Sequence, residues 1–188
     1  MPRSSDLFFV SSNRNKYSEA RDIAAIFGIR LGFIRCALEE IQSDSIRSIS
    51  KRKARDAFEK FARPVLVEDD GLFIDALGGF PGPFSSHAFE TIGNNGIMNL
   101  LGRDRHARFV SVVSYHSEFM AKSFEAEIHG KIADLAKGKG WGYDPIFIPD
   151  NMDKTFAQLT DKNTISHRFG SIKRFSRWYL RTRGSCDR

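Results

Sequence analysis

Cysteine and long apolar runs are both scarce in this sequence. The two cysteines, Cys36 and Cys186, lie far apart and form no CxxC pair. The pattern therefore indicates neither a disulfide framework nor a zinc knuckle, and both are predicted to be free thiols. No apolar run approaches the roughly 18 residues that a membrane-spanning helix needs, and the first residues become polar too soon for a signal peptide. We expect a soluble, cytoplasmic protein with no membrane partner.

Repeats, low-complexity segments and long flexible linkers are also lacking. Nothing in the sequence therefore marks a domain boundary. The chain has 188 residues, of which 41% are hydrophobic, and this is enough to bury a sizeable core. We expect residues 1–188 to form one domain of two closely packed lobes, with a frayed tail over residues 181–188.

The balance of charge favours cations. There are 29 Lys and Arg against 23 Asp and Glu, for a formal net charge of +6, which points to a polyanionic partner such as a nucleotide or a nucleic acid. Part of this charge lies in residues 172–188, where basic side chains on a final helix fit a solvated face at least as well as a binding site. A basic nucleic-acid-binding module is one function that the composition allows.

Periodicity predicts a mixed α/β fold. A short buried strand at residues 7–10 precedes a helix whose apolar face carries Ala20, Ile23, Ala24 and Phe27. Because early strand-helix units are followed by paired strands, we expect a mixed sheet with helices around it rather than a doubly wound fold. Further strands are expected at 28–36, on both sides of an acidic turn within 64–77, at 109–115, at 121–132 and at the end of 140–149. Further helices are expected at 46–61 and after Ser166. The glycines and prolines of residues 78–84 predict a rigid loop.

Residues 11–16, Ser-Ser-Asn-Arg-Asn-Lys, join the first strand to the first helix. Unpaired backbone N–H groups and the helix dipole favour an anion at such a junction. The serines and Asn13 can donate hydrogen bonds to phosphate oxygens, and Lys16 adds a positive charge. The segment lacks the glycines and the GK(S/T) ending of a Walker A loop. Taken by itself, it also fits an ordinary helix cap with exposed basic residues.

Three consecutive carboxylates, Glu68, Asp69 and Asp70, precede Gly71. They repel one another unless a cation holds them, and oxygen-rich clusters of this kind suit Mg²⁺. The same four residues also fit a turn with glycine at its last position. The Glu-Glu pair at residues 39–40 could add a carboxylate, although it fits a solvated loop as well.

Two later segments carry aromatic and basic side chains. In residues 141–145, Trp-Gly-Tyr-Asp-Pro, a ring beside glycine and a nearby acid suit a purine base, which can stack on the ring and donate to the carboxylate. A turn that caps the core would have a similar sequence. Further on, Lys162, His167 and Arg168 could bind phosphate or donate to the oxo groups of a base, although a histidine near a helix N-terminus is more often structural.

Taken in order, these segments resemble the inosine triphosphate pyrophosphatase family, whose members remove non-canonical purine nucleotides. The resemblance runs from about Phe8 to Trp178. SSNRNKYSE resembles the family pattern (S/T)-x-N-x-x-K-x-x-E, EEIQ is similar to its E-x-Q segment, and KARDA to a further segment. These likenesses assign triphosphate binding to Ser11, Asn13 and Lys16, metal binding to Glu40, and a place near the nucleotide to Lys53.

The remaining likenesses concern the acidic segment and the base. VLVEDDGLFIDALGGFPGPFSS resembles the acidic motif and its following loop, GWGYDPIF resembles G-(F/W)-G-(W/Y)-D-P-x-F, and KNTISHR resembles K-N-x-x-S-H-R. They imply that Asp69 is catalytic and binds magnesium, that Glu68 helps to activate water, and that Ser86 contacts the substrate. They place Trp141, as the stacking ring, with Gly142, Tyr143 and Asp144 around the base, and assign Lys162 to phosphate and His167 and Arg168 to the purine oxo groups.

The resemblance also implies an activity and an architecture. ITP, dITP or XTP would be cleaved between the α- and β-phosphates with Mg²⁺ as the cofactor, for which Mn²⁺ could substitute. The fold would be an elongated mixed β-sheet with flanking helices, forming two lobes around a central nucleotide-binding cleft, in a homodimer with no stable nucleic-acid complex. A pyrophosphatase for other modified nucleotides is the alternative, which the residues at 141–145 and 166–168 argue against.

Two residues depart from the family pattern. Asp70 stands where Ser or Thr is usual, and a third carboxylate would repel a triphosphate unless it engages the metal. Either the metal site is altered or Asp70 points away; we group it with the substrate-contacting residues. Gln158 stands where the family has Glu, which removes a charge but keeps a hydrogen-bonding group.

Overall fold

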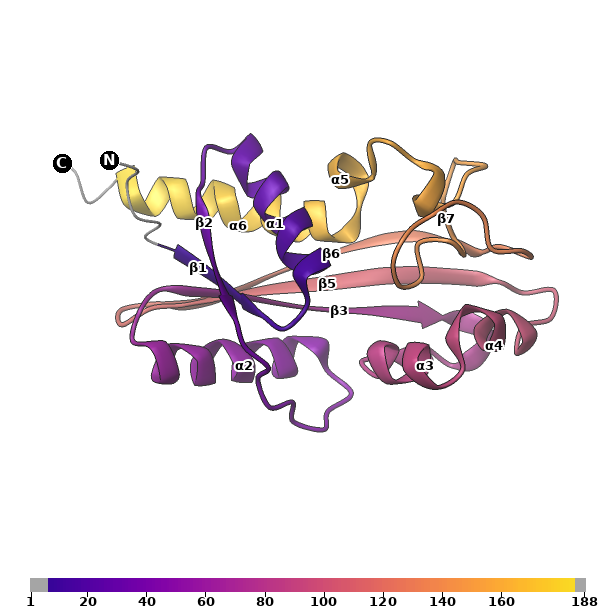
Figure 1. Ribbon diagram of the computed structural model, residues 1–188, viewed down its shortest axis with the longest axis horizontal. Helices are drawn as coiled ribbons and strands as arrows, with labels where there is room; N and C mark the ends of the chain where they lie inside the picture. The colour runs from indigo at the N-terminus through magenta and orange to yellow at the C-terminus, as the bar shows by residue number, and fades with distance from the viewer. Residues whose placement is uncertain (1–6, 185–188) are drawn as a thin grey trace.

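The structure, a computed structural model, describes residues 7–184 (Figure 1). It has the mixed α/β fold that the sequence predicts. In chain order its elements are β1 (Leu7–Ser11), α1 (Arg14–Ile26), β2 (Leu31–Arg35), α2 (Ile46–Phe61), β3 (Val65–Ile74), η1 (Asp75–Leu77), β4 (Pro81–Gly82), α3 (Ser85–Thr91), α4 (Gly93–Asn99), β5 (His106–His116), β6 (Ala121–Ile132), β7 (Phe147–Pro149), η2 (Phe156–Gln158), α5 (Lys162–Ile165) and α6 (His167–Gly184).

The strands form one mixed sheet in the order β2-β1-β3-β5-β6-β7, with β4 beside β3. β1 pairs in parallel with both β2 and β3, whereas β3, β5, β6 and β7 pair with one another in antiparallel fashion. The parallel strands are those that α1 and α2 connect, since a parallel pairing needs a long crossover. The expectation of a mixed sheet rather than a doubly wound fold is confirmed.

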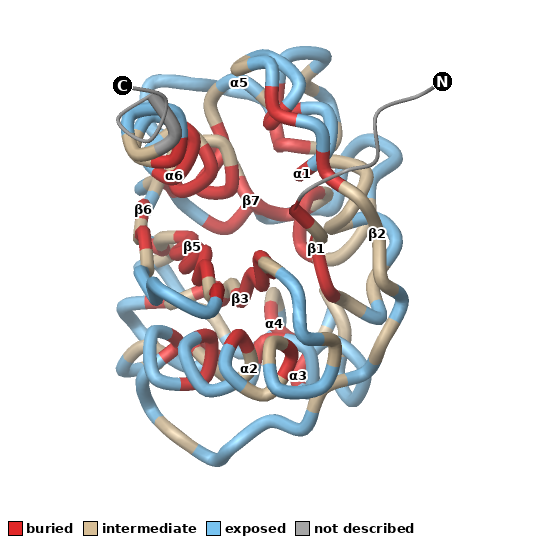
Figure 2. The backbone as a smooth tube through the Cα atoms, turned by 90° about the vertical axis from the view of Figure 1, so that its left-hand side faces the viewer, coloured by how far each residue is buried: buried red, intermediate tan, exposed pale blue. Residues whose placement is uncertain are grey.

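Helices cover both faces of the sheet. α1, α5 and α6 lie on one face, and α2, α3 and α4 lie on the other (Figure 1). The helices turn their buried residues toward the strands (Figure 2). In α2, for example, Ile49, Ala54 and Ala57 are buried, at the spacing that the apolar pattern predicts.

The long paired strands β3 and β5 run between two hydrophobic clusters. Leu66 of β3 and Val113 of β5 belong to a cluster with α1 and α6. Leu72 of β3 and Phe109 of β5 belong to another, which includes side chains of α4 and β7. The acidic residues 68–70 therefore lie between the two clusters, in the middle of the sheet.

One edge of β3 is open beside these acidic residues. β1 pairs with β3 at Val65 and Leu66, and β4 pairs with it at Leu72 and Phe73. Between these points, residues 67–71 pair with β5 and have no strand on the other side within the described chain. Side chains from both faces of the sheet can therefore reach a common space at this gap.

The predicted acidic turn within residues 64–77 is wrong. β3 is one continuous strand and pairs with β5 from Val65, opposite His116, to Ile74, opposite Ala107. Gly71 serves close packing instead, because a Cβ atom there would lie 2.4 Å from the carbonyl oxygen of Gly82 in β4. The long pairing with β5 prevails over the local turn preference of these residues.

The C-terminal helix α6 continues to Gly184, past residue 181 where we expected fraying to begin. Residues 185–188, which include Cys186, lie outside the described residues. Within the described residues Cys36 forms no disulfide. Across residues 7–184, no helix combines the length and the apolar character required to cross a membrane.

Candidate active site

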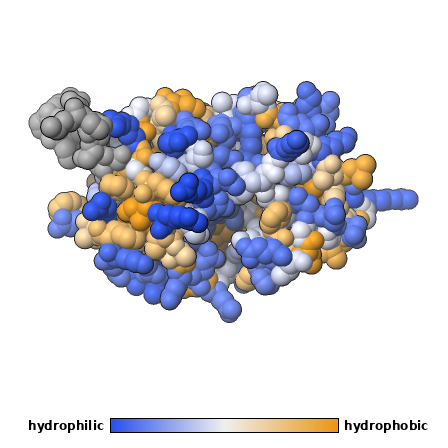
Figure 3. Space-filling model, in the orientation of Figure 1, coloured by the Kyte–Doolittle hydropathy of each residue, from blue (hydrophilic) through white to orange (hydrophobic). Residues whose placement is uncertain are grey.

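A cavity of about 540 Å³ lies at the gap beside β3. The face of the molecule seen in Figure 3 is hollowed near its middle, among hydrophilic residues. The structure brings every predicted site residue to this cavity, while their individual roles stay predictions. They are Ser11, Asn13, Lys16, Glu40, Lys53, Glu68, Asp69, Asp70, Ser86, Trp141, Gly142, Tyr143, Asp144, Lys162, His167 and Arg168.

The acidic residues of β3 point to both faces of the sheet, as successive side chains of a strand do. Glu68 and Asp70 each contact Lys16 of α1 and Arg168 of α6. Asp69 contacts Lys53 of α2, on the opposite face. Three consecutive carboxylates can share one strand because each finds a cation.

Asp69 has one engaged and one free carboxylate oxygen. The Nζ of Lys53 donates to Asp69 Oδ1 at 2.6 Å and to Glu40 Oε1 at 2.7 Å. Asp69 Oδ2 is buried and has no hydrogen-bond partner in the described part of the chain. Burial raises the pKa of Asp69, although Lys53 and Lys16 oppose this effect. An unpaired buried carboxylate oxygen suits a hard cation, so Glu40 and Asp69 fit the predicted magnesium site.

On the other face, Arg168 is only 1% exposed and lies among three carboxylates. Its Nε lies 3.2 Å from Glu68 Oε1, which also accepts a hydrogen bond from Ser111 Oγ at 2.9 Å. Arg168 pairs with Glu19 and Asp70 as well. Burial acts to lower the pKa of Arg168, but the carboxylates prevail and raise it. Glu68 is thus held by Ser111 and Arg168. Its part in activating water stays a prediction.

Asp70 points into the cavity rather than away from it. Its Oδ1 accepts a hydrogen bond from Lys16 Nζ, and its Oδ2 accepts one from Arg168 and lies 3.6 Å from His167 Nε2. Burial favours the protonated form, but Lys16 and Arg168 hold the pKa of Asp70 well below its usual range. Asp70 is thus a partly buried anion paired with two cations that the resemblance assigns to substrate.

His167 is buried with both ring nitrogens unpaired. It is 3% exposed, and its ring stacks on Phe109 with centroids 4.5 Å apart. Among residues 7–184, neither nitrogen has a hydrogen-bond partner. Burial lowers the pKa of His167, although Asp70 opposes the shift. A neutral imidazole at this position can offer one N–H donor and one lone pair to a ligand.

Glu19 of α1 is a site residue that sequence reasoning missed. It accepts hydrogen bonds from Lys162 Nζ at 2.8 Å, from Trp141 Nε1 at 2.9 Å and from Arg168. Burial acts to raise the pKa of Glu19, but Arg168 and Lys162 prevail and lower it. Two signals were available. Glu19 is the final Glu of the pattern (S/T)-x-N-x-x-K-x-x-E, and residues three apart on a helix, such as Lys16 and Glu19, share a face.

Lys162 lies among the residues assigned to the base. Its Nζ donates to Asp144 Oδ2 at 2.6 Å and sits 5.3 Å from the centre of the Trp141 ring. These contacts place Lys162 beside Asp144 and Trp141, and its assignment to phosphate stays a prediction. Tyr143 is buried, and its hydroxyl donates to the carbonyl of Ser85 at 2.8 Å, so Tyr143 offers the cavity its ring.

The loop before α1 differs from the expected row of unpaired N–H groups. Asn13 is the N-cap of α1, and its Oδ1 accepts hydrogen bonds from the backbone N–H groups of Asn15 and Lys16. Ser11 Oγ in turn accepts from the N–H of Asn13 at 3.1 Å. The expectation that these N–H groups are free for an anion is therefore wrong, because side-chain capping satisfies them. Lys16 Nζ remains the cation that this segment brings to the cavity.

Ser86 is exposed, and its hydroxyl lies 3.5 Å from Glu90. Its neighbour Ser85 is buried instead and holds the loop to β3. The Oγ of Ser85 accepts from the N–H of Leu72 at 2.8 Å and donates to the carbonyl of Gly82 at 2.6 Å. Ser86 is thus exposed at the cavity with a long hydrogen bond to Glu90, while Ser85 fixes the backbone beside it.

Comparison with known proteins decides the family. The model of the Ham1 family matches residues 7–178. This chain belongs to the Ham1 family. Among its Ham1 relatives, the dITP/XTP pyrophosphatase of Methanopyrus kandleri is 46% identical over 179 residues, which cover 92% of this chain and 95% of that protein. The dITP/XTP pyrophosphatase of Thermococcus kodakarensis is 38% identical over 177 residues, with 92% and 96% covered.

Solved Ham1 structures share the fold. The Ham1 protein of Staphylococcus aureus is 30% identical and superposes with a TM-score of 0.76 over 92% of this chain and 98% of its own. The HAM1 protein of Coxiella burnetii is 26% identical, with a TM-score of 0.79 over 93% and 99%. The family resemblance and the predicted mixed sheet with flanking helices are confirmed.

Gln158, one of the two departures of this Ham1 chain, has a local role. Its Oε1 accepts hydrogen bonds from the N–H of Thr155 at 3.1 Å and from Thr155 Oγ1 at 3.3 Å, which caps η2. A glutamate offers the same oxygen, so glutamine preserves the cap without the charge. Asp70 is the departure that changes the charge inside the cavity.

Proposed function

We propose that this Ham1 chain hydrolyses dITP, ITP and XTP to the nucleoside monophosphate and pyrophosphate, and so clears non-canonical purine nucleotides. The names of relatives that align over 95% and 96% of their own lengths support this function. The observation that carries it is the lining of one cavity, where Lys16 and Lys53 approach from opposite faces of β3 and Trp141 lies with His167 and Arg168.

The lysines suit the triphosphate. Lys16 and Lys53 are bound to carboxylates in the structure, and phosphate oxygens would compete for the same N–H donors. When the bond between the α-phosphorus and the bridging oxygen breaks, negative charge grows on the pyrophosphate that leaves. Fixed ammonium groups beside that charge lower the barrier without reorganising.

Glu40 and Asp69 would hold the Mg²⁺ that this chemistry uses, and Mn²⁺ could replace it. The metal supplies charge neutralisation to the triphosphate. Asp69 is the carboxylate with an unpaired oxygen, which we assign to the metal, and Glu68 on the same strand is our candidate to help activate the attacking water. The new bond joins the water oxygen to the α-phosphorus as the leaving group departs in line.

Selectivity for the base follows from the donors in the pocket. Trp141 offers a face for stacking, while Arg168 and the neutral His167 can donate to O6 of hypoxanthine or xanthine. Adenine carries an amine at that position and would leave the buried N–H of His167 unpaired, which discriminates by several kcal/mol, on the order of 10³-fold or more in rate.

The test is a substrate panel. Purified protein is incubated with Mg²⁺ and dITP, ITP, XTP, GTP, ATP, CTP or UTP, and pyrophosphate and orthophosphate are quantified separately. Pyrophosphate from dITP, ITP and XTP, with little from ATP, is the expected result. Turnover confined to other nucleotides would reject the purine assignment, and orthophosphate as the product would reject the position of cleavage.

The same proposal includes a homodimer, a cytoplasmic location and no stable nucleic-acid complex. Phe80, Phe84 and Ile92, close together in the chain, each expose more than 40% of their surface, and a second copy could cover such apolar surface. Sedimentation equilibrium should give twice the 21.3 kDa mass of one chain, and a monomer at that measurement would reject the dimer.

A further inference from the structure

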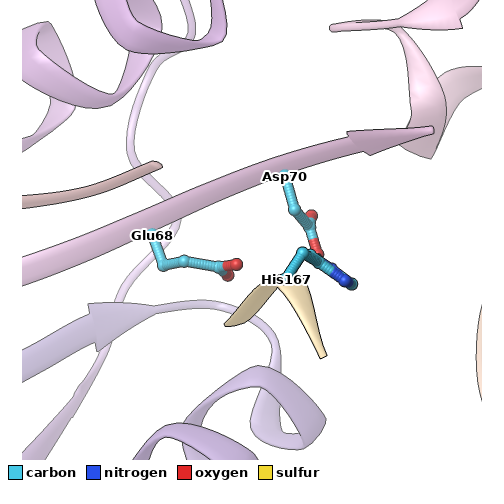
Figure 4. A group of neighbouring side chains, drawn as sticks. All are labelled: Glu68, Asp70 and His167. Atoms are coloured by element: carbon cyan, nitrogen blue, oxygen red, sulfur yellow. The ribbon is translucent and has the colours of Figure 1, made fainter. Parts of the chain in front are cut away.

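Three side chains beside the proposed magnesium site form a second group of metal ligands. Glu68, Asp70 and His167 each offer one ligand atom, and these atoms lie within 4.8 Å of one another (Figure 4). The two carboxylates lie on the same face of β3, and the histidine begins α6. Asp69, which we assign to magnesium, points to the opposite face toward Lys53. The two groups are therefore separate.

The histidine is an independent sign of a ligand. His167 is only 3% exposed, yet neither of its ring nitrogens is hydrogen-bonded within the part of the chain described. Its Nε2 faces Asp70 Oδ2 at 3.6 Å. A buried polar atom without a partner is costly, and such atoms mark places where an ion or a ligand binds.

The charges around this group are unbalanced. Four carboxylates, those of Glu19, Glu68, Asp70 and Asp144, contact three cations, those of Lys16, Lys162 and Arg168, in one connected network. The network has one excess negative charge before any substrate enters. If a triphosphate takes the ammonium of Lys16 from Glu68 and Asp70, the excess becomes two, which is the charge of one divalent cation.

We propose that Glu68, Asp70 and His167 hold a second divalent cation, of the Mn²⁺ type, when a nucleoside triphosphate occupies the cavity. This inference rests on the proposed function, because the substrate is what removes Lys16 from the carboxylates. The cation replaces the positive charge of Lys16 beside the two carboxylates, which Arg168 still contacts. It also satisfies one nitrogen of His167.

The ligand set indicates the class of metal. Mg²⁺ prefers oxygen ligands alone, whereas Mn²⁺ and its first-row neighbours accept imidazole nitrogen together with carboxylates. Coordination through Nε2 fixes the proton on Nδ1, because a neutral imidazole carries only one. His167 can then bind the metal and still donate a hydrogen bond to the base.

The experiment counts and identifies bound Mn²⁺. Protein carrying ¹⁵N-labelled histidine is saturated with α,β-methylene-dITP, which cannot be cleaved between its α- and β-phosphates, and is titrated with Mn²⁺. Nucleotide binding is measured first by calorimetry, and bound Mn²⁺ is counted by electron paramagnetic resonance. Pulsed measurements on the same samples detect ¹⁵N coupling to Mn²⁺, which separates imidazole from the unlabelled purine nitrogens.

We expect two Mn²⁺ per wild-type chain, one of them coupled to ¹⁵N. In Asp70→Asn, which keeps the size of the side chain, we expect one Mn²⁺ without ¹⁵N coupling. The thermal melt should stay cooperative but fall, because the charge that pairs with Lys16 and Arg168 is lost. Asp70→Ser, which also removes the carboxylate, should give the same result if the first variant folds poorly. A single oxygen-bound Mn²⁺ in the wild type, or a ¹⁵N-coupled ion that remains in both variants, would reject the second metal site and leave the proposed function standing. Failure of the analogue to bind would overturn the site together with the proposed function.

Discussion

The ammonium of Lys53 lies 2.6 Å from one carboxylate oxygen of Asp69, while the other oxygen of Asp69 meets no donor from residues 7–184. Lys53 thus anchors the side chain at a fixed orientation. The second oxygen is left for a ligand in the cavity. Burial raises the pKa of Asp69, which means that it disfavours the ionised form. A cation bound to the second oxygen would stabilise that ionised form.

Asp69→Asn should abolish most activity with little effect on folding. Asparagine keeps the shape and can still accept from Lys53, but its neutral amide holds Mg²⁺ far less tightly than a carboxylate. We expect kcat for dITP to fall by about 10²–10³-fold or more, and the melting temperature to stay within about 5 °C. Steady-state pyrophosphate release and a thermal melt measure the two effects.

Asp75→Asn is the matched control, since Asp75 is exposed and directly follows the same strand. Its activity and its melt should both equal those of the wild type. Unfolding of Asp69→Asn at room temperature would instead assign Asp69 a structural role.

Trp141→Ala should weaken substrate binding. Stacking of a base on an aromatic ring contributes roughly 1–3 kcal/mol, so the KM for dITP should rise by about 5- to 150-fold. Trp141→Phe keeps a ring but loses the indole N–H that donates to Glu19, and its KM should rise much less. Initial rates over a range of dITP concentrations separate KM from kcat. An alanine variant with the wild-type KM would show that the base lies elsewhere.

Glu19→Gln should destabilise the fold in a pH-dependent manner. The pKa of Glu19 is lowered in the fold from its ordinary value of 4.5, since Arg168 and Lys162 outweigh burial. Its ionised form therefore adds stability above about pH 4.5, and this contribution is lost as the pH falls through the lowered pKa. Glutamine does not titrate. At pH 7 we expect the free energy of unfolding to drop by about 1–3 kcal/mol.

Urea unfolding of both proteins from pH 7 down to pH 3 measures that difference, which should shrink below pH 4.5. Glu118→Gln changes an exposed carboxylate on the loop between β5 and β6 and should show no such trend. A destabilisation of Glu19→Gln that is equal at every pH would mean that packing, rather than charge, is lost.

The sequence allowed much of the site to be predicted, because the cavity is lined by short segments whose residue types are characteristic. Lys16, Asp69 and Trp141 come from three distant segments, yet all line one space. What could not be predicted depends on partners far away in the chain. Glu19 contacts Arg168 only when α1 meets α6, and the local pattern that ends at Glu19 does not identify this partner.

The wrong assignment of residues 68–71 to a turn has the same origin. Local preference favours a turn, but strand β5 supplies a partner for every residue of β3 from Val65 to Ile74. The error about the N–H groups before α1 is of the opposite kind, since Asn13 satisfies them locally. For the N–H groups of Asn15 and Lys16, the alternative prediction of an ordinary helix cap was correct.

Gly71→Ala tests the close packing that replaces the turn. A Cβ atom at Gly71 would lie 2.4 Å from the backbone oxygen of Gly82 and 2.8 Å from Cδ1 of Ile46. The isoleucine can rotate, but the oxygen belongs to β4, so the short strand must shift away from β3. We expect the free energy of unfolding to fall by about 1–3 kcal/mol in urea titrations.

Gly102→Ala is the control, because nothing in the described chain lies within 4 Å of a Cβ there, and it should be nearly neutral. Equal stability of the two variants would mean that β4 is free to move, and that Gly71 is not required for the edge that closes the cavity.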